Sequence, residues 1–221
     1  MQYTSGSTGD PKGVMISHGN LVHNSYLIRE YFETETGSSV VSWLPPYHDM
    51  GLIGGILGAI YGGMHQVLMP PATFLQKPLR WLKAISDYRA AISGGPNFAY
   101  DLCVDTISDD DLATLDLSCW ELAFSGAEPV RAPTIDKFIH RFGGCGFRAK
   151  AFYPCYGMAE TTLIVTGHKR GELLHRLPFN QEKIHDNRAI AVEEQDPDAT
   201  FLVSSGRVKP PQKLFIVHPE T

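Results

Sequence analysis

Short apolar runs that end in glycine- or proline-rich turns recur along this chain, and they constrain its fold more than any other feature. These runs are typical of buried strands, and they comprise residues 39–44, 66–69, 90–93, 120–124 and 151–153. Segments with the character of helices separate them, at residues 17–32, 51–63, 78–88 and 132–142. Strands that alternate with helices predict an α/β fold with a largely parallel sheet flanked by helices.

The segment from Tyr3 to Val14, YTSGSTGDPKGV, combines four Ser or Thr hydroxyls, three glycines and one lysine. Glycines let the backbone approach a ligand closely, and N–H groups offered together with hydroxyls form a concave anion site. Lys12 adds a point charge suited to phosphate oxygens. The spacing differs from a Walker A loop. A polar linker is the alternative, but Pro-Lys-Gly-Val followed by a helix cap at Ser17 favours a phosphate loop.

Three later turns also follow strand-like runs, so they fall at the edge where open α/β sheets bind ligands. The first is PPYHDMG (45–51), and a solvated surface pair of His48 and Asp49 is its alternative interpretation. The second is SGAEPV (125–130), which read alone is compatible with a simple tight turn. The third is PCYGMAETTL (154–163), for which a capped helix start is the alternative.

Taken in order, TSGSTGDPKGV, LPPYHDMG, SGAEPV and YGMAETTL resemble the signature motifs of adenylate-forming enzymes. This superfamily contains acyl-CoA synthetases, luciferases and nonribosomal adenylation domains. The sequence Tyr-His-Asp-Met-Gly within the second motif is most similar to that of fatty-acyl-AMP ligases. The resemblance implies that residues 1–221 are a partial AMP-binding (adenylation) domain, cut at both ends from the large N-terminal domain of such an enzyme.

The resemblance implies catalytic roles for Lys12, His48 and Glu160. Lys12 and the hydroxyls of the loop would hold the β- and γ-phosphates of ATP, and His48 would border the substrate carboxylate. Glu160 would ligate Mg²⁺, which takes one or two carboxylates together with phosphate oxygens. Tyr156 would border the adenine and Thr161 the α-phosphate. Nucleotide contacts are implied for Thr4, Ser5, Gly6, Ser7, Thr8, Gly9, Lys12, Ser125, Gly126, Ala127, Glu128, Tyr156, Gly157, Met158 and Thr161.

Two segments are candidates for the acyl site. In the family, the turn that corresponds to residues 94–96 lines this site, so Asn97 and Phe98 are candidates, with helix capping and core packing as the alternative. The small residues between Gly51 and Gly63 permit either close helix packing or an acyl tunnel beside the segment.

The resemblance implies that a fatty acid and ATP form an acyl-adenylate and pyrophosphate. The acyl group would then pass to an acyl carrier protein of lipid or polyketide synthesis. The alternatives are an acyl-CoA ligase fragment and a non-catalytic nucleotide- or acyl-binding remnant. Residues 167–199 resemble an extra segment of fatty-acyl-AMP ligases. The family's ribose-binding aspartate and its C-terminal domain with the catalytic lysine would lie beyond Thr221, so we expect the isolated chain to be inactive or weakly active.

Composition argues against other partners. The net charge is −5 without a basic run, which argues against nucleic acid. The longest apolar run, Met50–Met64, is too short to span a bilayer, and the start of the chain has no signal-peptide pattern, so we expect a cytoplasmic protein.

Asp109–Asp111 is interpreted as a solvated helix start rather than a metal site. Residues 201–206 and 213–217 predict two strands of a second sheet.

Overall fold

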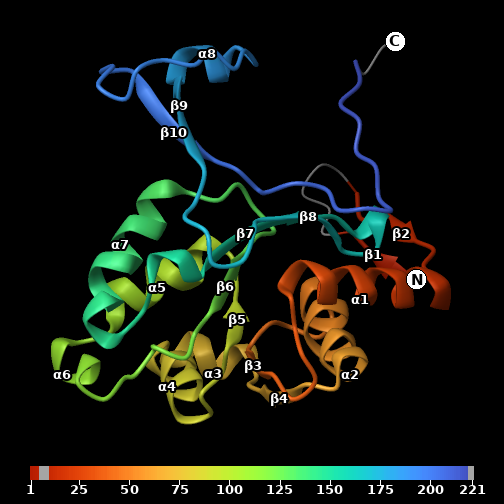
Figure 1. Cartoon of the computed structure of the whole chain (residues 1–221), viewed down its shortest axis with the longest axis vertical. Coiled ribbons are helices and arrows are strands. Elements are labelled where there is room, and N and C mark those ends of the chain that lie inside the picture. The colour runs from red at the N-terminus through yellow and green to blue at the C-terminus, as the bar shows by residue number, and fades with distance from the viewer. Residues whose placement is uncertain (5–9, 219–221) are drawn as a thin grey trace.

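The computed structural model of the chain describes residues 1–4 and 10–218. A six-stranded sheet in the order β4-β3-β5-β6-β7-β8 forms its centre (Figure 1). All neighbouring strands are parallel except β7 and β8, which are antiparallel. The predicted α/β fold with a largely parallel sheet is therefore confirmed. The strands are β3 (Ser39–Ser42), β4 (His65–Leu68), β5 (Ile92–Gly94), β6 (Leu122–Ser125), β7 (Phe152–Gly157) and β8 (Ile164–Gly167).

Helices cover both faces of the sheet and make three layers (Figure 1). Each face of the sheet has its own hydrophobic core, because successive side chains of a strand point to opposite faces. In β3, Val41 packs in the core on one face and Val40 in the core on the other. One face carries α3 (Pro71–Gln76), α4 (Leu79–Asp87), α5 (Asn97–Thr106) and α7 (Ala132–Phe142). The other carries α1 (His18–Phe32), the π-helix η1 (Met50–Leu57) and α2 (Gly58–Gly62).

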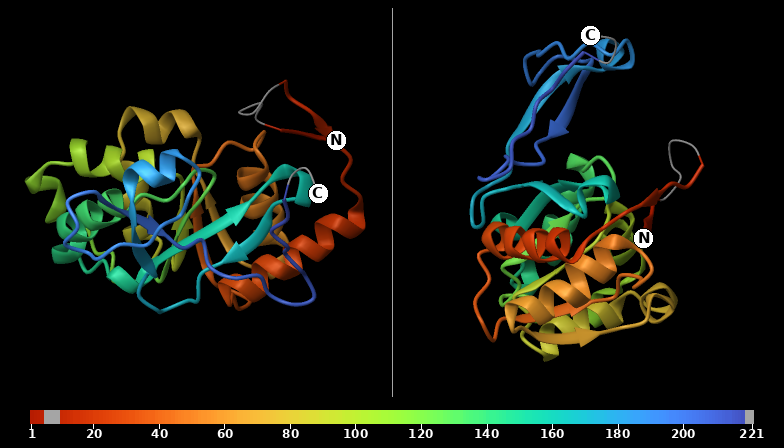
Figure 2. Two further views of the ribbon diagram at one scale, coloured as in Figure 1. Left: turned by 90° about the horizontal axis from the view of Figure 1, so that it is seen from above. Right: turned by 90° about the vertical axis from the view of Figure 1, so that its right-hand side faces the viewer.

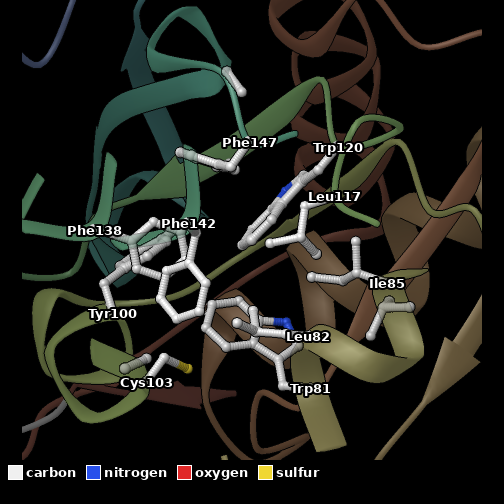
Figure 3. Close-up of a cluster of buried hydrophobic side chains, with 14 of the residues drawn as sticks. Trp81, Leu82, Ile85, Tyr100, Cys103, Leu117, Trp120, Phe138, Phe142 and Phe147 are labelled. Atoms are coloured by element: carbon white, nitrogen blue, oxygen red, sulfur yellow. The ribbon is translucent and has the colours of Figure 1, made fainter. Parts of the chain in front are cut away.

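Aromatic rings fill the first of these cores (Figure 3). The ring centroids of Trp81 in α4 and Trp120 are 5.4 Å apart, and those of Tyr100 in α5 and Phe138 in α7 are 5.0 Å apart. The rings of both pairs meet edge to face. The buried indole N–H of Trp81 donates to the Ser93 hydroxyl at 2.8 Å. Truncating one such buried ring to alanine costs about 3–5 kcal/mol, so this core holds the helices firmly on the sheet.

A short hairpin leads into α1. Its strands are β1 (Gln2–Tyr3) and β2 (Gly13–Val14), paired antiparallel. Ser17 begins α1 as predicted: its hydroxyl accepts the Asn20 N–H at 3.1 Å, and the Asn20 side chain accepts the Ser17 N–H at 2.9 Å. The hairpin is thereby fixed to the start of the longest helix in the described part of the chain.

The region after β8 forms an arm that projects from the sheet (Figures 1 and 2). It consists of β9 (Arg176–Asn180), α8 (Gln181–His185) and β10 (Ala199–Val203), with β9 and β10 antiparallel. Its root contacts the main body, because a guanidinium nitrogen of Arg176 lies 2.7 Å from the Asp136 carboxylate of α7 and Val203 packs against the aromatic core. The arm overlaps the predicted extra segment at residues 167–199 from β9 onwards and extends beyond it to Val203.

Two local expectations differ from the structure, and other elements, among them β8 and α3, were not predicted. The predicted helix at residues 51–63 divides into η1 and α2. The strand predicted at residues 213–217 is wrong: this stretch has no strand partner in the described region, and Ile216 is 94% exposed. A run of apolar residues indicates a strand only where a neighbouring strand is present to form backbone hydrogen bonds with it.

Asp109–Asp111 begin the short helix α6 (Asp109–Leu112), in which the Ser108 hydroxyl accepts the Asp111 N–H at 3.3 Å. This confirms the predicted helix start. Across residues 1–4 and 10–218, no group of three or more metal-ligating side chains gathers in a way that could hold an ion. Within the same residues, no helix combines the length and apolarity that a membrane crossing requires.

Candidate active site

A cavity of about 650 Å³ lies where three strands of the sheet end. His48 and Asp49 follow β3, Gly126 and Ala127 follow β6, and the residues from Tyr156 to Glu160 end or follow β7. All of them line the cavity. Because the carboxyl ends of parallel strands meet at one edge of a sheet, motifs separated by more than a hundred residues converge there. The structure thus brings the later predicted motifs to a single place.

The hairpin that carries the predicted phosphate loop reaches the cavity through β1 and Thr4. Gln2, Tyr3 and Thr4 line the wall. The ends of the loop are tied together, because the Thr4 N–H donates to the Lys12 carbonyl and the Lys12 N–H donates to the Thr4 hydroxyl, both at 2.9 Å. The Lys12 side chain is exposed and is not part of the wall. The predicted contacts Ser5, Gly6, Ser7, Thr8 and Gly9 lie outside the described residues.

His48 and Asp49 form an ion pair at the rim. The Nδ1 atom of His48 lies 2.8 Å from Oδ1 of Asp49, and that carboxylate also accepts the Met50 N–H at 2.7 Å. The hydrogen bond to Asp49 raises the pKa of His48 above its usual value, against a smaller opposing effect of burial. The pair is therefore a fixed, partly solvated unit that borders the cavity, and His48 retains a cationic form over a wider pH range than a free histidine.

The turn after β6 presents backbone to the cavity. A Cβ at Gly126 would lie 3.0 Å from the Cys155 carbonyl oxygen, so glycine allows the two strands to approach. Ala127 has a φ of 70°, a conformation that costs a non-glycine residue energy and that clusters at functional sites. Ser125 is buried and Glu128 is exposed, and neither lines the cavity. Within the predicted adenine turn, the structure therefore places Gly126 and Ala127 at the cavity.

The third motif forms a tight turn between β7 and β8. Tyr156, Gly157, Met158 and Glu160 line the cavity. The Met158 N–H donates to the Leu163 carbonyl at 2.9 Å and closes the turn. Thr161 faces a second, smaller cavity of about 280 Å³, whose wall also includes Glu160. Glu160 therefore offers its carboxylate at the boundary of two spaces.

Apart from Gly54, which belongs to the segment 51–63 for which close packing and an acyl tunnel were both considered, sequence reasoning missed the apolar wall of the main cavity. This wall is formed by Ile28, Phe32, Gly54, Phe124, Cys155, Leu163 and Ile164. Burial raises the pKa of the Cys155 thiol to about 12, so it acts as an uncharged wall group. Asn97 and Phe98 do not line the cavity. The Asn97 amide donates to the Pro129 carbonyl and accepts the Arg131 N–H, both at 2.9 Å, which supports the alternative of helix packing.

Comparison with known proteins gives a consistent family. The AMP-binding enzyme family matches residues 1–221. The medium-chain-fatty-acid–[acyl-carrier-protein] ligase TtuA of Teredinibacter turnerae is 45% identical over 219 residues, which cover 99% of this chain and 34% of TtuA. The chain spans about a third of the length of the curated relatives it matches.

Two solved structures have the same fold. The fatty acid AMP ligase from Legionella pneumophila superposes with a TM-score of 0.94 at 50% identity, covering 100% of this chain and 38% of that one. A fatty acyl-adenylate ligase from L. pneumophila, in complex with acyl adenylate and pyrophosphate, superposes with a TM-score of 0.89 at 51% identity, over 94% and 36% of the two chains.

Proposed function

Because the chain belongs to the AMP-binding enzyme family, we propose that the protein activates a fatty acid as an acyl-adenylate at the expense of ATP. One observation supports this most. A single cavity has two kinds of wall. One is polar and contains the start of the predicted phosphate loop, the His48–Asp49 pair, Gly126, Ala127 and Glu160, and the other is apolar. This is the combination that a polyphosphate, a flat base and an alkyl carboxylate need together.

The reaction proposed is a displacement at phosphorus. A carboxylate oxygen of the fatty acid forms a bond to the α-phosphorus of ATP, the bond to the bridging oxygen breaks, and pyrophosphate leaves with the electron pair. His48 borders the carboxylate, and Lys12 contacts the β- and γ-phosphates. The backbone of Gly126 and Ala127 and the ring of Tyr156 hold the adenine. Positioning and charge neutralisation lower the barrier in such reactions.

The residues present fit a role for Mg²⁺ beside the phosphates. Mg²⁺ prefers oxygen ligands and uses few protein carboxylates, completing its shell with phosphate oxygens and water. Glu160 supplies one carboxylate in the wall of both cavities, whereas Asp49 is already paired with His48. When bound, the ion neutralises phosphate charge. We propose that Glu160 is its protein ligand.

We propose an acyl carrier protein as the acceptor of the acyl group, and treat CoA as the second candidate. The arm supports the first choice, because β9, α8 and β10 form an extra element after the third motif, and its root pairs with α7 through Arg176 and Asp136. An extra segment at this position is what the resemblance to fatty-acyl-AMP ligases implies. Supplying the purified protein with ATP, a fatty acid and either acceptor separates the two: thioester on the carrier protein supports the proposal, and acyl-CoA alone contradicts it.

The adenylation step is tested by fatty-acid-dependent exchange of labelled pyrophosphate into ATP, using the protein at its full natural length. Exchange that requires a fatty acid is expected. In Glu160→Gln, the Mg²⁺ concentration for half-maximal exchange should rise, because a neutral amide binds a hard cation less well than a carboxylate. Absence of exchange with every fatty acid would overturn the function, and an unaltered Mg²⁺ titration would remove Glu160 from the metal site.

A further inference from the structure

Asn97 is a buried polar residue that lies outside the cavity wall, beside the turn that follows β6. It begins α5 and is 1% exposed. Its amide nitrogen donates to the Pro129 carbonyl and its amide oxygen accepts the Arg131 N–H, both at 2.9 Å. A buried polar group costs stability unless it is hydrogen-bonded, and here both ends of the amide are used. Asn97 therefore fixes the path of the main chain as it leaves the turn.

The start of the same turn is held from the same segment of the chain. The Phe124 carbonyl of β6 accepts the Gly95 N–H at 3.0 Å and the Tyr100 hydroxyl at 2.7 Å. Between the two held points lies Ala127, which lines the cavity with a φ of 70°. A strained conformation of this kind persists only where the surrounding structure imposes it. Residues 95–100 supply hydrogen bonds on both sides of the strained residue.

We propose that Asn97 is a positioning residue for the nucleotide, which holds the turn after β6 in the conformation that binds the adenine. This inference rests on the proposed function, in which the backbone of Gly126 and Ala127 contacts the base. Asn97 acts through the turn, because it is not part of the cavity wall. Without its two hydrogen bonds, the turn adopts the binding conformation for only a fraction of the time, and the apparent affinity for ATP falls in proportion to that fraction.

The test is pyrophosphate exchange with ATP and, separately, with GTP, using the protein at its full natural length. Asn97→Ala should raise the KM for ATP by about tenfold, the effect of a turn that is competent for about a tenth of the time. The KM for the fatty acid should stay unchanged. The ratio of kcat/KM for ATP to kcat/KM for GTP should fall, because the turn contacts the base rather than the phosphates. A general loss of stability would leave this ratio unchanged.

Asp101→Asn is the matched control on the same helix. Asp101 lies one turn after Asn97, and its carboxylate accepts hydrogen bonds from the side chains of Arg131 at 2.8 Å and Thr134 at 3.1 Å. These bonds join α5 to the start of α7 through side chains and do not hold the main chain of the turn. The control should therefore keep the KM for ATP and the nucleotide ratio of the unaltered protein.

Asn97→Asp is a second variant of the same shape. Its carboxylate still accepts the Arg131 N–H but no longer donates to the Pro129 carbonyl, and negative charge is favourable in the first turn of a helix. The nucleotide ratio should fall in this variant too. If Asn97→Ala does not fold, as judged by its melting curve, Asn97→Asp decides alone by the same ratio.

The outcomes are distinguishable. A KM for ATP and a nucleotide ratio in the Asn97 variants equal to those of the unaltered protein would overturn the role of Asn97 and leave the proposed function standing. An equal fall of the ratio in Asp101→Asn would also overturn it, because packing of α5 against α7 would then be the cause. Absence of exchange with any acid in the unaltered protein would overturn both proposals.

Discussion

Asn24 of α1 holds the segment that carries Glu160, although it is not part of the main cavity wall. Its side chain is 2% exposed. The amide donates to the carbonyls of Thr161 at 3.3 Å and Ile164 at 3.1 Å, and its oxygen accepts the Ile164 N–H at 3.0 Å. Three hydrogen bonds from one side chain therefore join α1 to the turn between β7 and β8.

Asn24→Leu removes all three bonds and keeps the number of side-chain heavy atoms. A typical intramolecular hydrogen bond contributes about 1 kcal/mol net, and each buried backbone group left without a partner costs about 1–3 kcal/mol. We therefore expect a loss of roughly 3–5 kcal/mol in the free energy of unfolding. For a domain of this size, 1 kcal/mol corresponds to about 2–4 °C in Tm, so the melting temperature should fall by roughly 10 °C.

The assay is thermal unfolding followed by circular dichroism, with ATP affinity measured at a temperature below both transitions. Asn24→Leu should also weaken ATP binding, because the backbone next to Glu160 is no longer held in place. Tyr26→Leu is the control on the same helix, at a side chain that is 41% exposed. A melting temperature of Asn24→Leu equal to that of the control would refute the reasoning that these bonds stabilise the turn.

Three further outcomes are expected. Gly157→Ala should destabilise the protein by about 1–3 kcal/mol or more, because its Cβ would lie 2.2 Å from the Leu163 carbonyl oxygen at the end of the same turn. Gly143→Ala, with open space around it, should leave the denaturation midpoint unchanged. Lys12→Ala should raise the KM for ATP in pyrophosphate exchange without lowering Tm, since the side chain is exposed; unchanged kinetics would remove it from the site. Because the pKa of His48 is raised, its pairing with Asp49 stabilises the fold fully below about pH 6.5, and this contribution is lost as the pH rises through the folded-state pKa. Asp49→Asn should therefore flatten the dependence of the free energy of unfolding on pH in that window. Identical pH profiles for the variant and the unaltered protein would contradict the pairing.

The arrangement of the predicted motifs followed from simple rules. Each strand-like run ended in a small or rigid turn, and parallel strands bring such turns to one edge. These rules predict that His48, Gly126 and Glu160 lie together, and the cavity includes all three. The helix predicted at residues 132–142 also has the observed bounds, because its apolar spacing and the glycines after Phe142 define both ends.

Other features depend on information that local patterns do not carry. β8 runs antiparallel to β7 because a turn of only a few residues joins them, and a parallel partner would need a long crossover. The strand expected at residues 213–217 has the right composition but no neighbour to pair with among the described residues. Ile28 and Phe32 have the helical spacing of core residues, and they are core residues that also line the cavity. Periodicity cannot separate these two roles.

The glycines of η1 show where a sequence signal for the apolar wall existed. A glycine inside a helix costs about 1 kcal/mol relative to alanine, so each one in this segment needs a reason. Gly51 has one, because its Cβ would lie 2.1 Å from the Pro45 carbonyl oxygen, and Gly55 packs its backbone against Ser42. Gly54 has a different neighbour, because a Cβ at position 54 would lie only 3.0 Å from a methyl carbon of Leu163. Contact with a side chain of the β7–β8 turn, rather than with backbone, is therefore the reason for glycine at this point of the cavity wall.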